Sequence, residues 1–113
     1  MASSSQIAFG PLGPTITFTA ATPTAPTGFQ APVHATTNTS AGQYRIINDS
    51  TVTVFLGVGA TSAEAITAAG AIATSIPLLP GTDEVLRFSP FAFFTGKSSS
   101  GAATVYITPG QGL

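Results

Sequence analysis

The chain has 113 residues, a length that fits one domain built around a single core. Charged residues make up 6% of it and hydrophobic residues 43%, whereas an ordinary soluble domain is about 25% charged. Three widely spaced basic residues cannot form the positive surface that binds nucleic acid, and the absence of cysteine excludes disulfides and thiolate metal sites. The surface must therefore be built mainly from Thr, Ser, Ala and Gly, which favours a protein that other subunits cover.

Membrane segments and export signals are also not expected. The first residues, Met1-Ala-Ser-Ser-Ser-Gln6, place no basic segment before an apolar run, so they do not form a signal peptide. Every apolar stretch is broken by Pro, Gly or a polar residue before it reaches about 18 residues. The sequence therefore predicts no membrane partner.

Residues 1–42 are rich in Pro, Thr, Ala and Ser and predict an extended arm with one or two short strands. The first candidate strand is 15–20, and the second is 28–33, which Pro32 confines to the edge of a sheet. Such an arm becomes ordered by packing either on a neighbouring subunit or on the body of its own domain, with aromatic side chains as anchors. The aromatic residues of the arm are Phe9, Phe18 and Phe29.

Residues 43–57 predict the centre of the fold. Two runs rich in β-branched and aromatic residues flank Asn48-Asp49-Ser50, which is typical of a β-hairpin. Because side chains alternate along a strand, the apolar residues of each run share a face. They are Tyr44 and Ile46 in the first strand, and Val52, Val54 and Leu56 in the second. Since a hairpin alone is marginal in water, the rest of the chain must supply the sheets that cover it.

After the expected hairpin, the pattern indicates one short helix and several strands. Thr61 and Glu64 fit a capping box, so a helix of about two turns should begin near Ser62. Short strands separated by turn residues follow at 76–79, 84–89, 91–96 and 103–108. This spacing predicts an all-β fold, an antiparallel β-sandwich or jelly roll with one short helix and an extended N-terminal arm. Residues 43–113 form the β-sandwich body.

One glycine-rich segment imitates a cofactor site. Gly57-Val-Gly59-Ala-Thr-Ser62 follows a strand and opens a helix, as a dinucleotide-binding loop does, and Asp83 lies at about the distance of a ribose-binding acid. However, Ser62 stands where the third glycine belongs, and prolines interrupt the segment that would be the second parallel strand. We therefore expect no cofactor.

The titratable residues each have a structural interpretation. His34 has no carboxylate near it in the sequence, so it indicates neither a catalytic triad nor a metal site. Asp49 belongs to a turn, Glu64 to the helix cap, and Asp83 and Glu84 to a loop. The sequence predicts no catalytic residue and no metal ligand, and hence a protein that is not an enzyme.

A second group of aromatic residues is a candidate for contacts with partners. Phe91, Phe93, Phe94 and Tyr106 could form a platform on which sugars stack. Alternation puts Phe91 and Phe93 on one face and Phe94 on the other, so we expect the first two in the core and Phe94 at the surface. The candidate interface anchors are then Phe9, Phe18, Phe29 and Phe94.

Several short motifs resemble those of small virion proteins of tailed bacteriophages, in particular head decoration (cement) proteins. The motifs are Tyr44-Arg-Ile-Ile-Asn48, Val54-Phe-Leu-Gly57, an Ala-rich helix, Leu78-Leu-Pro-Gly81, Phe93-Phe-Thr95 and Val105-Tyr-Ile-Thr-Pro-Gly110. The resemblance covers residues 43–113 and not the arm. It implies a β-sandwich present in many copies on the capsid exterior, made in the host cytoplasm and clamping adjacent major capsid subunits, and it brings no catalytic residues.

The sequence thus favours a structural protein of the virion, a capsid decoration protein. The expected partners are the major capsid protein and copies of the chain itself, as a homo-oligomer on the capsid. The alternative is a tail-fibre or spike module that binds host glycans, which requires an exposed aromatic patch.

Overall fold

Two antiparallel sheets and one helix make up the described part of the chain in the computed structural model, which covers residues 10–11, 13, 15–30, 43–87 and 92–111. Sheet I contains β1 (Gly10–Pro11), β2 (Ile16–Ala20), β4 (Gln43–Asp49), β7 (Asp83–Arg87) and β9 (Ala103–Gln111). Sheet II contains β3 (Phe29–Gln30), β5 (Val54–Gly59), β6 (Ile76–Leu78) and β8 (Phe93–Ser98). Helix α1 (Ser62–Ala69) and a 3₁₀ turn, η1 (Ile72–Thr74), connect β5 to β6.

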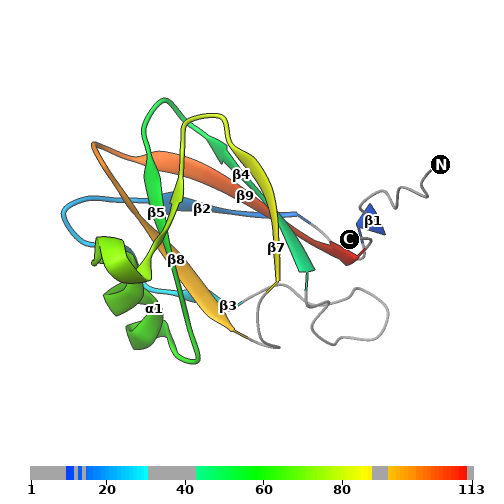
Figure 1. Ribbon diagram of the computed structural model, residues 1–113, viewed down its shortest axis with the longest axis horizontal. Coiled ribbons are helices and arrows are strands. Elements are labelled where there is room, and N and C mark those ends of the chain that lie inside the picture. The colour runs from blue at the N-terminus through cyan, green and yellow to red at the C-terminus, as the bar shows by residue number, and fades with distance from the viewer. Residues whose placement is uncertain (1–9, 12, 14, 31–42, 88–91, 112–113) are drawn as a thin grey trace.

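The strand order defines a jelly roll. Strand β2 pairs with β9, β3 with β8, β4 with β7 and β5 with β6, as in one long antiparallel ribbon folded back between β5 and β6. Two further pairings, β4 with β9 and β5 with β8, roll this ribbon into two facing sheets with the orders β2-β9-β4-β7 and β3-β8-β5-β6. Eight strands connected in this way form the two Greek keys of a jelly roll. The all-β prediction is confirmed, with the two sheets and α1 visible in Figure 1.

The core lies between the sheets and follows the period-two pattern of the strands. Tyr44 and Ile46 point inward from β4, and Val54 and Leu56 point inward from β5, all fully buried. Leu78, Val105 and Ile107 are also fully buried and complete the centre of the core. The faces expected for 43–57 are therefore correct, although Val52 lies in the loop before β5 and is only partly buried.

The hairpin expected over 43–57 is wrong. β4 belongs to sheet I and β5 to sheet II, and the loop between them crosses from one sheet to the other. Both edges of each strand are already occupied, those of β4 by β7 and β9 and those of β5 by β6 and β8. Alternation specifies which face of a strand is buried but not which strand it pairs with, and two strands that face each other across a core have the same pattern as a hairpin.

Part of the expected arm is built into the body. β2 pairs along β9 over five residues, from Ile16 opposite Ile107 to Ala20 opposite Ala103, and β3 pairs with β8 at the edge of sheet II. Phe18 is 4% exposed and Ala20 is fully buried. The strand expected at 15–20 and the edge strand expected near 28–33 both exist, and both are strands of the jelly roll.

Helix α1 begins as its sequence predicts. The Thr61 hydroxyl accepts a hydrogen bond from the Glu64 backbone N–H at 3.2 Å, and the Glu64 carboxylate accepts one from the Ala60 N–H at 3.1 Å. This is a variant of the reciprocal capping box in which the Glu64 carboxylate bonds the residue before the N-cap, and the helix runs for two turns to Ala69. It packs on the outer face of sheet II, over β5 and β8. Within the described residues, no helix is long and apolar enough to cross a bilayer.

Candidate functional site

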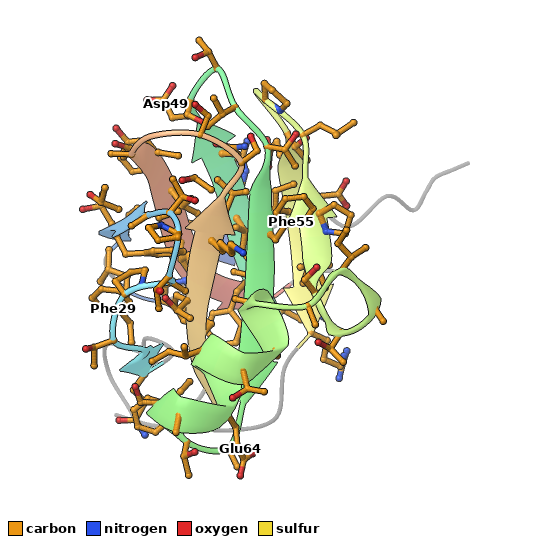
Figure 2. The ribbon with its side chains drawn as sticks, turned by 90° about the vertical axis from the view of Figure 1, so that its left-hand side faces the viewer. Phe29, Asp49, Phe55 and Glu64 are labelled. Atoms are coloured by element: carbon orange, nitrogen blue, oxygen red, sulfur yellow. The ribbon has the colours of Figure 1, made fainter. Side chains whose placement is uncertain are left out.

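Three of the four candidate anchors meet in the core. The Phe18 ring lies 5.4 Å from the Phe29 ring and 5.6 Å from the Phe94 ring, measured between centroids. Phe18 and Phe94 are buried, and Phe29 is half-buried against them, on the side of the molecule where β2 and β3 lie (Figure 2). These rings close the gap between the two sheets, so Phe18 and Phe94 are core residues and not surface anchors. Phe9 lies outside the described residues.

The face expected for Phe94 is wrong because alternation separates Phe93 from Phe94 without specifying which of the two faces the core. Phe94 is fully buried, and Phe93 lies on the opposite, partly exposed face; Phe91 is outside the described residues. Pairing with β5 places Phe94 opposite Val58 and Lys97 opposite Phe55, so Lys97 and Phe93 share the outer face. Keeping the Lys97 ammonium out of the core therefore turns Phe94 inward, a constraint that could have been read from the sequence.

The glycine-rich segment is the part of β5 against which α1 packs. A Cβ atom on Gly57 would lie 2.2 Å from the Ala69 backbone N and 2.3 Å from the Ala65 carbonyl O. A Cβ on Gly59 would lie 2.6 Å from the Cβ of Glu64. These glycines let the helix backbone approach the strand directly, which accounts for them without a cofactor.

The titratable residues do not gather in one place. Glu64 is engaged in the helix cap, Asp49 is exposed at the end of β4, and Asp83, which lies in β7 and not in a loop, forms an ion pair on sheet I. His34 lies outside the described residues. Among the residues that the structure describes, no group of three or more His, Cys, Asp or Glu side chains could hold a metal ion.

No described element packs on the outer face of sheet I, whereas α1 covers part of the outer face of sheet II. We call the outer face of sheet I the bare face. Its central cross-strand row contains Thr17, Tyr106, Ile47 and Asp83, which are opposite one another in the strand register. Adjacent rows add Thr15, Thr19, Gln43, Arg45, Asp49, Val85, Arg87, Thr104 and Thr108. All of these side chains are exposed or half-exposed.

The bare face has an apolar centre, threonine rows around it, and four charged side chains of balanced sign, Arg45, Arg87, Asp49 and Asp83. Ile47 and Tyr106 sit side by side in the middle, and the Thr15 and Thr108 hydroxyls hydrogen-bond to each other at 2.6 Å. An apolar centre within a polar rim is the usual anatomy of a protein interface. Threonine contributes a methyl and a hydroxyl group without a charge, so covering the threonine rows requires no desolvation of charge.

One ion pair lies on the bare face. The Arg45 guanidinium donates to both oxygens of the Asp83 carboxylate, from Nε at 2.9 Å and from Nη2 at 2.5 Å. This hydrogen bonding holds the pKa of Asp83 below its ordinary value of 3.8 and raises the pKa of Arg45. The pair therefore presents a locally neutral surface to any partner above about pH 4.

A second candidate surface is a depression of about 370 Å³ beside the end of α1. We call it the hollow. It is lined by Thr22, Phe55, Ala69, Gly70, Ile72, Lys97, Ser98 and Ser99. Ile72 is 80% exposed, and Leu79, in the β6–β7 turn, is 61% exposed. Sequence reasoning missed both this hollow and the bare face, because they are formed by strands that are far apart in the chain.

No family model, curated protein or solved structure matches the chain. The strand order defines the class of the protein, which is a jelly roll.

Proposed function

We propose that this chain is a structural protein of the virion that decorates the capsid of a tailed bacteriophage and stabilises it by bridging major capsid subunits. The observation that carries this proposal is the bare face, an open sheet surface with Ile47 and Tyr106 at its centre and with two basic and two acidic side chains, so that it has no net charge. The resemblance of the motifs in 43–113 to those of decoration proteins supports it, as does the low content of charged residues. On a capsid, many copies of such a contact act together, so each contact need not be strong.

The bare face is proposed as the surface that meets the shell. The Arg45–Asp83 pair is already neutralised within the chain, so a capsid subunit does not need to supply a matching charge. The threonine rows then contact the shell through methyl groups and hydroxyl hydrogen bonds. Binding of this type depends on shape and on apolar contact, and it should be only weakly sensitive to salt.

The test compares two threonine-to-lysine variants on opposite sides of the molecule. Thr17→Lys places a charge in the central row of the bare face, whereas Thr67→Lys places the same charge on the exposed side of α1. Both positions are exposed, so both variants should fold. Each protein is mixed with expanded capsids of the phage that encodes the chain, and co-sedimentation is measured. We expect Thr17→Lys to abolish capsid binding and Thr67→Lys to retain it; equal binding by both variants, or no binding by the wild type, would reject the proposal.

Glycan binding by a tail-fibre or spike module is the second candidate, and Tyr106 is the observation in its favour. Its half-exposed side chain lies on the bare face with Thr17 and Ile47 on either side, so the ring could stack on a sugar while neighbouring hydroxyls form hydrogen bonds. This alternative predicts binding of the isolated protein on a glycan array, and its loss in Tyr106→Ala. The decoration proposal predicts binding to capsids and none to glycans.

A further inference from the structure

Strand β7 is an open edge of sheet I. It pairs with β4 on one side, and no described strand lies on its other side. The other outer strands are less suited to pairing with a further strand. β3 has two residues, β6 contains Pro77, which has no N–H, and β2 has no charged side chain that could fix a register. Among the described strands, β7 therefore combines a proline-free edge with charges that can fix a register.

The backbone of β7 presents three residues to this open edge. The Thr82 carbonyl, just before β7, accepts a hydrogen bond from the Asn48 N–H of β4 at 2.9 Å. The direction of the backbone groups alternates along an antiparallel strand, so those of residues 84 and 86 also face β4. The N–H and C=O groups of Asp83, Val85 and Arg87 then face away from the sheet. A row of outward backbone groups is a template for a further strand.

The side chains of β7 are complementary to a reversed copy of the same strand. Asp83 and Arg87 are both exposed on the bare face, two residues before and two residues after Val85. When two copies of β7 run antiparallel and are centred on Val85, each Asp83 lies opposite the Arg87 of the other copy. Two parallel copies in register would instead bring like charges side by side. The order of charges therefore favours an antiparallel pair of β7 strands.

The ion pair on the bare face leaves Arg87 available for such a contact. Within the described residues, Asp83 pairs with Arg45, and Arg87 forms no ion pair. A carboxylate can accept about four hydrogen bonds. Asp83 can therefore keep its two bonds from Arg45 and accept others from the Arg87 of a second copy.

We propose that β7 pairs with β7 of a second copy of this chain, antiparallel and centred on Val85, so that sheet I continues from one copy into the other. The two outward rows of N–H and C=O groups bond each other, and each Asp83 lies between Arg45 of its own copy and Arg87 of the other. The contact joins the same surface on both copies, so it is two-fold and ends at a dimer. Both bare faces then lie on the same side of the joined sheet.

The contact is small, and one feature of β7 weakens it further. Glu84 alternates to the inner side of the strand, and an inward charge on an edge strand discourages pairing. The association of the free protein should therefore be weak and depend on concentration. This inference does not rest on the capsid proposal, because it concerns the free protein in solution.

The first experiment measures the mass of the full chain by sedimentation from about 10 μM to about 1 mM, the range in which small interfaces associate. We expect the average mass to rise towards that of a dimer and not to exceed it. Growth past a dimer would overturn the proposal. A protein that stays monomeric over the whole range would overturn it as well, and would leave the edge of β7 to an extended segment of another protein.

Amide hydrogen exchange, followed by NMR over the same concentrations, identifies the surface that associates. The N–H groups of Glu84 and Leu86 face β4 and should be protected at every concentration. Those of Asp83, Val85 and Arg87 should exchange rapidly in the monomer and slowly in the dimer. A dimer that forms without slower exchange at these three amides uses another surface, and the proposal is then wrong.

A charge exchange tests the register. Asp83→Arg alone and Arg87→Asp alone should each weaken self-association about tenfold or more, because each places like charges opposite one another twice in the two-fold contact. Mixing the two variants should restore association, since the two bases of one copy then lie opposite the two acids of the other. If mixing does not restore association, the proposed pairing of β7 is wrong.

The control for this mixture is Lys97→Asp, which makes the same change of net charge as Arg87→Asp but lies on sheet II. All three positions are exposed or half-exposed, so the variants should fold. Mixed with Asp83→Arg, the Lys97→Asp variant should not restore association. Equal association in the two mixtures would show that net charge alone drives it, and would overturn the proposed register.

Discussion

The buried side chain of Asn48 links the β4–β5 loop to the β6–β7 turn by hydrogen bonds. It is fully buried, its amide donates to the carbonyls of Val52 and Leu78, each at 2.9 Å, and its Oδ1 accepts from the Ser50 hydroxyl at 2.6 Å. This residue therefore joins the crossing between the sheets to the end of β6. A buried amide whose hydrogen bonds are satisfied in this way stabilises one arrangement of the loops over others.

We predict that Asn48→Ala destabilises the protein by about 2–4 kcal/mol, because it leaves buried carbonyl groups without donors and opens a cavity. Ser50→Ala keeps the amide donors and removes one hydroxyl, so it should cost about 1 kcal/mol. Urea unfolding monitored by circular dichroism measures both changes. Equal losses for the two variants would show that the Asn48 amide has no special role.

The Arg45–Asp83 pair makes a second prediction, concerning pH. Because the Arg45 hydrogen bonds lower the pKa of Asp83 in the folded state, the pair stabilises the protein above the ordinary pKa of 3.8. This stabilisation is lost as the pH falls through the lower, folded-state value. Both side chains are more than 40% exposed, so the effect should be small.

The measurement is the thermal unfolding midpoint of the wild type and of Asp83→Asn between about pH 7 and about pH 2, a range that spans the carboxyl titrations. The wild type should have the higher midpoint near pH 7, and the difference should vanish at the acid end. A difference that grows as the pH falls would contradict this assignment.

At the scale of elements, the close packing of α1 on β5 depends on Gly57. A side chain at this position meets the helix backbone at 2.2 Å, so Gly57→Ala forces the helix away from β5. We expect a loss of about 3 kcal/mol, at the upper end for overpacking. Gly70→Ala is the matched control, because its Cβ would meet nothing closer than 3.5 Å and its φ of -76° suits alanine. Denaturant unfolding of both variants checks the prediction, which fails if Gly57→Ala is as stable as the control.

The elements themselves were largely predictable from local chemistry, whereas their partners were not. The capping box at Thr61 and Glu64 depends on residues three apart, and the helix begins there. The buried faces of β4 and β5 follow from alternation. Their separation into two sheets depends on β6, β7, β8 and β9, which come later in the chain, so no local pattern near Asn48 contains that information.

The candidate surfaces show the same limit. Tyr106 and Ile47 are 59 positions apart in sequence and become neighbours only through the β4–β9 register, and Thr17 joins them from a third strand. The aromatic residues were the obvious candidates, and Phe18, Phe29 and Phe94 are used to fill the core. In a chain with so few charges, threonine rows make up much of the bare face. Threonine is an ordinary strand residue, so its position in a strand does not indicate an interface.

At the scale of the whole molecule, the N-terminal third supplies one edge of each sheet. β2 completes sheet I beside β9, and β3 completes sheet II beside β8, while Phe18 and Phe29 close the core between them. The arm and the body are therefore not independent units over 16–30. Residues 1–9 precede β1 and contribute to none of the described strands.

Two truncations test this dependence. Deleting residues 1–9 removes none of the described strands, so the product should fold and unfold cooperatively on heating. Deleting residues 1–42 removes β1, β2 and β3, exposes the edges of β8 and β9, and takes away two core phenylalanines. Loss of the buried Phe18 alone costs about 3–5 kcal/mol, and the half-buried Phe29 and the three lost strands add to it, against a whole stability of about 5–15 kcal/mol for a small domain. We expect near-UV circular dichroism to be native-like for the first product and lost for the second; a native-like spectrum for residues 43–113 alone would show that the body folds without the two edge strands.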